Sequence, residues 1–141
     1  MDTPKTRREL IDQVIDNLGV LVFGQAPSDE QVSKVDKLLD PALAMLAAQE
    51  VVYVADSGQP NPPSGGEIEQ AIFLPVSHAV TWACAPAFNL AGDPSLKALD
   101  TLAREDLLRI GRPAPARRTL RIDSQLASRR RHIAGSFSRG T

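Results

Sequence analysis

Two capped amphipathic segments between residues 6 and 49 restrict the possible folds more than any other feature of the chain. Thr6 is followed three residues later by Glu9, which is the spacing of a helix capping box, and Ser28 stands in the same relation to Gln31. Apolar residues then recur at helical spacing, at positions 10, 11, 14, 15 and 18 and at positions 32, 35, 38, 39, 43, 46 and 47. The sequence therefore predicts one helix over about residues 6–18 and a second that begins at Ser28.

Glycine and proline set the limits of these two helices. Gly19 is a natural end for the first helix, because glycine enters the left-handed region without a steric cost. Pro41 marks either a kink in the second helix or a new start with Asp40 as its N-cap. We expect a single kinked helix, since the apolar stripe stays in phase across the proline. Residues 20–23, with the sequence VLVF, are expected to insert into the core as a short connector.

The middle of the chain is less regular. Residues 51–55, with the sequence VVYVA, are short and rich in valine, and we expect an edge strand there at most. Residues 56–66 are rich in proline and glycine, which predicts a loop that does not pack and serves as a mobile tip or a contact loop. Aromatic residues make up only 4% of the chain, so the core must be mainly aliphatic, and such side chains suit helix-on-helix packing.

Helical spacing returns twice after this loop. A third helix is predicted over about residues 67–85, with a kink at Pro75 and an end at Pro86, and a fourth over about residues 94–110. We therefore expect an all-α fold, in which residues 1–110 form a four-helix domain with one short extended segment.

The charges are divided unequally along the chain. Residues 1–110 carry eight Lys or Arg and 16 Asp or Glu, a net charge of −8, whereas residues 111–141 carry eight Arg and one Asp, a net charge of +7. Pro113 and Pro115 favour an extended backbone just after the fourth helix, and few apolar residues follow. We expect residues 111–141 to form an extended basic C-terminal arm that becomes ordered on an acidic partner.

The candidate binding residues of this arm are its arginines and the apolar residues between them. They are Arg112, Arg117, Arg118, Leu120, Arg121, Ile122, Leu126, Arg129, Arg130 and Arg131. Binding to nucleic acid through phosphate groups is one interpretation. The arm lacks interleaved aromatic residues for base stacking, and apolar residues alternating with arginine suit a protein surface with acidic patches. We favour docking on a protein and keep nucleic-acid binding as the alternative.

Residues typical of a catalytic or metal site do not occur at useful spacings. His78 and Cys84 lie six residues apart, which is not a ligand spacing, and no base is positioned by the sequence to activate the thiol. The acids of the first two helices, among them Asp36 and Asp40, are spaced for solvated helix faces. We therefore expect no enzymatic activity, no cofactor and no metal.

The single cysteine and the absence of a signal-peptide pattern predict synthesis in a reducing, intracellular compartment. No apolar run approaches the roughly 18 residues that a membrane span requires, so we expect a soluble protein that contacts no membrane.

The order of these features resembles the bacteriophage head-to-tail adaptor proteins, a family also called tail accessory factors or head-completion connectors. Such proteins begin with a short helix ending in Leu-Gly, an apolar turn, a G-(E/Q)-x-P-S elbow and a second helix with a Leu-rich end. The matching residues here are Leu18-Gly19, Gly24-Gln25-Ala26-Pro27-Ser28 and Leu38-Leu39. The stretch AIFLPVSHAVTWACAPAFNLAGDP resembles the family's third helix, which closes on Ala-Pro and an aromatic residue. The resemblance covers about residues 6–110 and departs from the family at residues 51–66, where members often carry a longer insert.

This resemblance implies a structural subunit that forms a ring, typically of about twelve copies, beneath the portal protein of a phage or a phage-like particle such as a gene transfer agent. The ring would extend the channel through which DNA passes without sequence-specific binding, and it would present a platform to the next tail or stopper component. The C-terminal extension would reach onto the portal. The implied location is the head–tail interface of the virion, after synthesis in the bacterial cytoplasm.

Overall fold

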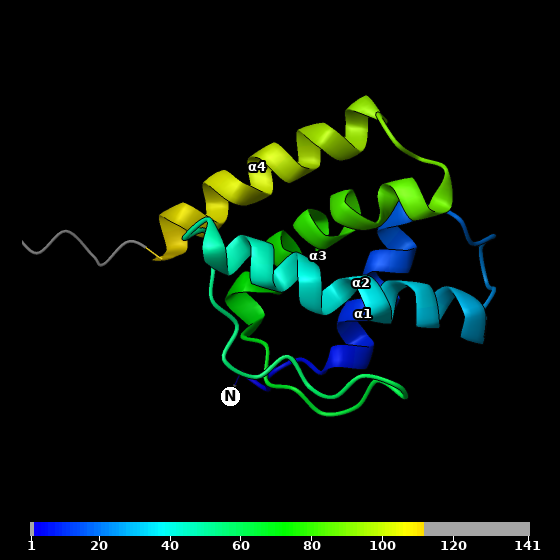
Figure 1. Ribbon diagram of the computed structural model, residues 1–141, viewed down its shortest axis with the longest axis horizontal. Helices are drawn as coiled ribbons and strands as arrows, with labels where there is room; N and C mark the ends of the chain where they lie inside the picture. Colours follow the sequence, from blue (N-terminus) through cyan, green and yellow to red (C-terminus); the bar gives the residue numbers. More distant parts are fainter. Residues whose placement is uncertain (1, 112–141) are drawn as a thin grey trace, which may run out of the picture.

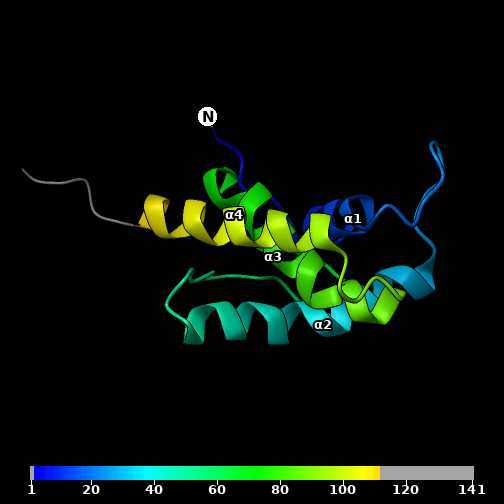
Figure 2. The same cartoon turned by 90° about the horizontal axis from the view of Figure 1, so that it is seen from above.

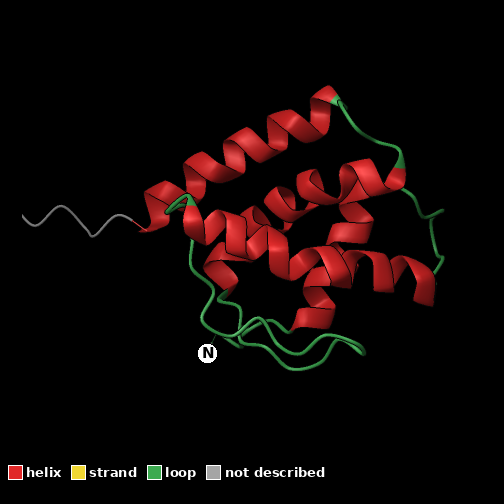
Figure 3. Cartoon of the chain, viewed as in Figure 1, coloured by secondary structure: helices red, strands yellow, loops and turns green. Residues whose placement is uncertain are grey.

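The computed structural model describes residues 2–111, and over these residues the protein is all-α (Figure 3). The elements in chain order are α1 (Arg7–Leu18), α2 (Asp29–Ala48), α3 (Gln70–Cys84), the short 3-10 helix η1 (Ala85–Phe88) and α4 (Pro94–Gly111). The four predicted helices are therefore confirmed. The predicted C-terminal arm lies outside the described residues.

α3 lies in the middle of the molecule, and α1, α2 and α4 each pack against it (Figure 1, Figure 2). α1 also packs on α2, whereas α4 has α3 as its main neighbour and forms one edge of the molecule. The core is aliphatic, as expected, and its fully buried side chains include Leu10, Ile15, Val35, Leu39, Val76 and Val80. Burial of each such side chain contributes about 1.5–3 kcal/mol to folding.

The central position of α3 explains its composition. Together with η1 it forms the stretch Gln70–Phe88, whose 19 residues and mean hydropathy of 1.4 make it long and apolar enough to cross a membrane by those two criteria. An apolar stretch of this length was not expected from the sequence. Half of the stretch is buried inside the protein, because a helix with neighbours on several sides needs an apolar surface that is wider than one stripe.

The helix ends follow the local signals in the sequence. Both predicted capping boxes are present, with the Thr6 hydroxyl accepting from the Glu9 amide and the Ser28 hydroxyl accepting from the Gln31 amide. Gly19 ends α1 in the left-handed conformation, with φ of 67°. α2 runs as a single helix through Pro41, which confirms the choice of one helix over two.

The expected edge strand over residues 51–55 is wrong. These residues run irregularly away from the end of α2, and within residues 2–111 the only β-type contacts are two isolated bridges, Lys5 with Ile68 and Gln59 with Ser64. A strand needs a neighbouring segment along its length, and the described part of the fold supplies none to residues 51–55. The bridge from Lys5 holds Ile68 in extended backbone, so that α3 begins at Gln70 and not at the expected residue 67.

The connector between α1 and α2 also differs from its prediction. Val20 and Leu21 are half-buried against the core, but Val22 is 69% exposed and Phe23 is fully exposed. The Gln25 amide donates to the Val22 carbonyl at 2.9 Å in a turn that has Gly24 at φ of 84°. This turn projects from the body (Figure 2), and the exposed Val22 and Phe23 belong to it.

Candidate functional site

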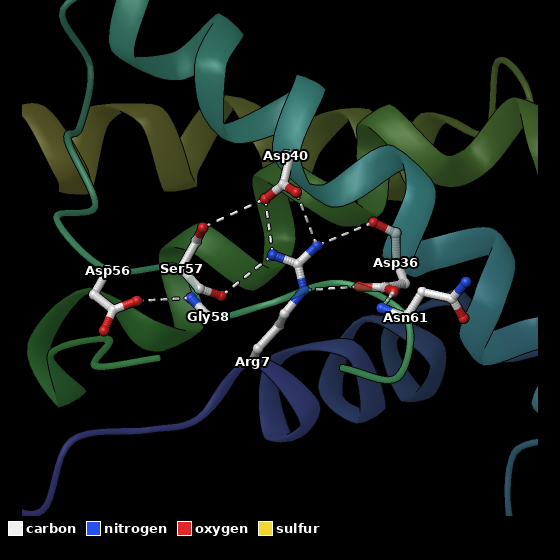
Figure 4. A network of polar contacts seen from close by, with 7 residues as sticks. All are labelled: Arg7, Asp36, Asp40, Asp56, Ser57, Gly58 and Asn61. Carbon is white, nitrogen blue, oxygen red and sulfur yellow. Dashed lines mark hydrogen bonds and ion pairs between the residues drawn. The ribbon is translucent and has the colours of Figure 1, made fainter. Parts of the chain in front are cut away.

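Arg7, the first residue of α1, is fully buried and joins three segments of the chain (Figure 4). Its Nε donates to Oδ1 of Asp36 at 2.7 Å, and its Nη1 and Nη2 donate to the two carboxylate oxygens of Asp40 at 2.8 and 3.2 Å. Nη2 also donates to the Asp36 carbonyl, and Nη1 donates to the Ser57 carbonyl. Each guanidinium nitrogen therefore has an acceptor, which is the condition for keeping a charge in the interior.

The loop over residues 56–66 closes over this guanidinium. The Asn61 amide donates to Oδ2 of Asp36 at 2.9 Å, and the Gly65 carbonyl accepts from the Arg7 amide at 2.8 Å. The expectation of a loop that does not pack was therefore wrong. Its polar backbone groups replace the apolar contacts that its composition lacks, and they hold it against α1 and α2.

Two glycines permit this close packing. A Cβ at Gly58 would lie 2.6 Å from the Ser64 carbonyl oxygen and 2.9 Å from Cβ of Arg7. A Cβ at Gly66 would lie 3.1 Å from the Gly58 nitrogen. Both glycines also have positive φ, so a side chain at either position would meet strain as well as crowding.

The network shifts the pKa values of Asp40 and Arg7 in the directions that keep these two groups charged. Hydrogen bonds from Arg7, followed by its positive charge and the Ser57 hydroxyl, lower the pKa of Asp40, although burial opposes this shift. Burial alone would lower the pKa of Arg7, but the hydrogen bonds and charges of Asp40 and Asp36 outweigh it and raise the pKa above its usual value. A guanidinium that holds its proton so firmly is no acid or base, and we interpret the network as a structural junction.

Sequence reasoning missed this junction because it placed Asp36 and Asp40 on solvated faces. Asp36 is buried, with 4% of its surface exposed, and Asp40 is half-exposed but pairs with Arg7. A signal was available, since Arg7 precedes Leu10, Ile11 and Val14 at helical spacing and so belongs to the buried face of α1. Asp36 likewise shares a face with Val32, Leu39 and Leu43.

The reactive side chains noted in the sequence lie on α3. Cys84 is fully buried, and burial raises the pKa of its thiol to about 12, which keeps it protonated and unreactive. His78 is half-buried on the same helix. Within residues 2–111, no three His, Cys, Asp or Glu side chains are grouped so that they could hold a metal ion.

A groove of about 440 Å³ lies where the carboxyl ends of α2 and α4 meet residues 51–55 and the start of α3. We call it the α2–α4 groove. Its apolar lining includes Val51, Val54, Leu107 and Ile110, together with Tyr53, which is 78% exposed. Three exposed acids, Glu50, Glu67 and Glu69, also line it, and the described lining residues include no lysine or arginine. The groove is therefore apolar within and negatively charged, a combination that suits a basic segment with apolar side chains.

α4 presents a further apolar surface, formed by Leu99, Leu102 and Ile110, of which Ile110 also lines the groove. These residues lie on one side of the helix by their spacing, next to its buried face, and are between 39% and 57% exposed. We call them the α4 strip. Figure 1 shows that, among the described residues, no other helix lies outside α4. Leu99 and Leu102 are neighbours about one turn apart, and Ile110 lies two turns further on, beyond the exposed Asp106. Exposed large apolar side chains that gather on one side of a helix are typical of a contact with another protein.

The candidate binding residues from position 112 to position 131 all lie outside the described residues. The surfaces found here are additional to them. The sequence contains the residues of the α2–α4 groove, but no pattern links them, because the groove joins segments that are far apart along the chain.

No protein-family model matches this chain, and no curated protein matches it.

Proposed function

We propose that this protein is a non-enzymatic head-to-tail adaptor of a phage or phage-like particle, which forms a ring beneath the portal and extends the DNA channel. The four-helix body is the rigid part of such a subunit, and residues 111–141 supply a basic arm that reaches the portal protein. The ordered series of motifs between Leu18-Gly19 and the Ala-Pro of the third helix supports this proposal.

The observation that carries the proposal is the uncovered α4 strip on the helix that leads directly into the arm. A subunit with an unpartnered apolar face at one edge suits repeated contact with a neighbouring copy. When such a contact joins two different surfaces and the rotation between copies closes, it produces a ring. The acidic body is consistent with a conduit, because a surface of net charge −8 repels phosphate and lets DNA pass.

Binding to portal rings tests the role of the arm. Full-length protein is expected to decorate purified portal rings of the same particle in electron micrographs. Deletion of residues 112–141 is expected to leave the helical circular-dichroism spectrum intact and to abolish decoration. Normal decoration by the truncated protein would show that the arm is not the docking element.

A full-length variant provides a sharper comparison. Replacement of Arg117, Arg118 and Arg121 by glutamine is expected to weaken portal binding, since each lost ion pair at an interface removes part of the attraction. Arg139→Gln, outside the candidate set, serves as the control for loss of a distal charge and is expected to bind normally. Equal affinities of the two variants would contradict the assignment.

The eight arginines of the arm also favour a second candidate, a small nucleic-acid-binding protein. A protein that neutralises several phosphates loses affinity steeply as salt rises, with a slope of about −0.9 per contact on duplex DNA. Gel shifts with duplex DNA across a salt series separate the two functions. The adaptor is expected to show weak binding, whereas tight binding with a steep slope would favour the second candidate.

A further inference from the structure

We propose that the α2–α4 groove binds residues 112–118 of the same chain, the segment RPAPARR that follows α4. This intramolecular site is independent of the proposed adaptor function, because it needs only the body and its own arm. In this arrangement residues 112–118 stay bound to the four-helix body until another partner of the arm displaces them.

The position of the groove selects this occupant. Gly111, the last described residue, lines the groove itself, and so does Ile110 on the final turn of α4. The next residue of the chain is Arg112, so the segment starts at the groove and needs no linker to reach it. A segment tethered this closely is present at an effective concentration of about millimolar, far above that of a free protein partner.

The chemistry of the two surfaces is complementary. The groove offers Glu50, Glu67 and Glu69, and the segment offers Arg112, Arg117 and Arg118. Arginine forms directional, charge-assisted hydrogen bonds with carboxylates, and these bonds both attract the segment and fix its orientation in the groove. The pairing of three acids with three arginines leaves no excess charge.

The apolar part of the segment suits the groove in the same way. Pro113 and Pro115, which are separated by Ala114, favour an extended polyproline conformation, which loses little entropy on binding. Segments of this type dock in grooves that contain aromatic side chains. Tyr53, whose side chain is 78% exposed, provides one beside Val51 and Val54.

Limited trypsin digestion of the full-length protein tests this site. Trypsin cuts after arginine, so a docked segment protects the bonds after Arg117 and Arg118 and leaves the bond after Arg139 free. A variant with Glu50, Glu67 and Glu69 replaced by glutamine is expected to be cut after Arg117 and Arg118 roughly tenfold faster, the size expected when three weak ion pairs act together. Cleavage after Arg139 is the internal reference and is expected to stay unchanged.

A matched control removes three charges elsewhere. Asp16→Asn, Glu30→Gln and Glu105→Gln change exposed acids that do not line the groove, and they are expected to leave the cleavage rates at wild-type values. Tyr53→Ala keeps every charge and removes the exposed aromatic ring, and we expect it to raise cleavage after Arg117 and Arg118 severalfold, the loss expected for one exposed aromatic contact. Thermal melts of each variant confirm that the body is folded.

Two outcomes would overturn the proposal. Equal cleavage of the wild type and the groove variant would show that the segment does not occupy the groove. Protection that disappears on dilution would show that the occupant belongs to a second copy of the chain, because an intramolecular site is independent of concentration.

Discussion

At the scale of single residues, Arg7 decides how the first helix is held. A buried charge is tolerated only when its partners replace the water it has lost, and Arg7 has two carboxylates and two carbonyls around it. These partners come from α2 and from the loop over residues 56–66. One side chain therefore ties three separate segments together.

Replacing Arg7 tests this role, and its neighbour provides the control. Arg7→Met is expected to lower the free energy of unfolding by about 3–5 kcal/mol, because Asp36 would remain buried without a counter-charge. Arg8→Met removes an exposed ion pair with Asp12 and is expected to cost less than about 1 kcal/mol. Urea denaturation of both variants measures the difference, and similar losses in the two would contradict the structural role of Arg7.

The lowered pKa of Asp40 predicts how stability responds to acid. The pKa of Asp40 in the folded protein lies below its value of about 4 in the unfolded chain. At a pH between these two pKa values, the unfolded state therefore binds more protons than the folded state. The contribution of Asp40 is fully present above about pH 4 and is lost as the pH falls through the folded pKa. We expect Asp40→Asn to reduce the fall in unfolding free energy between neutral pH and pH ~3. The expected difference between Asp40→Asn and the wild type is modest, because the Asp40 side chain is 48% exposed and solvent screens its interaction with Arg7.

The control for this measurement is Asp16→Asn, on the exposed surface of α1. Its unfolding free energy is expected to fall with pH as steeply as that of the wild type. If Asp40→Asn shows the same steep fall, the ion pair with Arg7 does not contribute to acid sensitivity.

At the scale of elements, the loop over residues 56–66 depends on close backbone contact. Gly58 and Gly24 both have φ of 84°, but a Cβ at Gly58 would collide with the Ser64 carbonyl oxygen, whereas a Cβ at Gly24 would meet no atom within 4 Å. A comparison of substitutions at Gly24 and Gly58 therefore separates the energetic cost of a positive φ from the energetic cost of steric crowding.

We expect Gly24→Ala to lower the free energy of unfolding by about 1–2 kcal/mol, the usual cost of a side chain in the left-handed region. Gly58→Ala is expected to cost at least about 2 kcal/mol more, since the loop must move away from Arg7. Thermal or urea unfolding measures both values. Equal costs would show that the loop yields easily and that its packing adds little stability.

The elements also show which parts of the fold could be predicted from the sequence and which could not. The helix positions followed from local signals, such as the Thr6 and Ser28 capping boxes, that act within a few residues. The errors fell on residues 20–23 and 51–66, whose positions depend on contacts with distant parts of the chain. The junction at Arg7 and the α2–α4 groove were missed for the same reason, because no local pattern records which segments meet in space.

At the scale of the whole molecule, the proposed adaptor function assigns the α4 strip to the contact between copies. Leu102→Glu places a charge in the strip and is expected to prevent ring formation on portal complexes, because burying that charge would cost several kcal/mol. Thr101→Glu changes an exposed residue on the opposite side of α4 and is expected to leave assembly normal. Electron microscopy of the complexes distinguishes them, and intact rings with Leu102→Glu would place the subunit contact elsewhere.

The separation of charge is also a property of the whole chain. An acidic body and a basic arm attract each other, so any external partner of the arm must compete with the body for the same arginines. The separation is visible in the amino-acid sequence alone, because it depends only on where the charged residues fall along the chain. The place on the body that suits the arm cannot be read from the sequence, since only the fold brings Glu50, Glu67 and Glu69 to the same groove.

The contacts of Arg7 have a consequence for the order of events during translation. Arg7 leaves the ribosome early, but its amide pairs with the Gly65 carbonyl, and 58 residues separate the two positions. At synthesis rates of about 5–20 residues per second, the Arg7 amide waits roughly 3–12 s before its acceptor has been made. During this interval the apolar face of α1 also lacks α3, against which it packs in the folded protein, so the nascent first helix is a candidate substrate for chaperones.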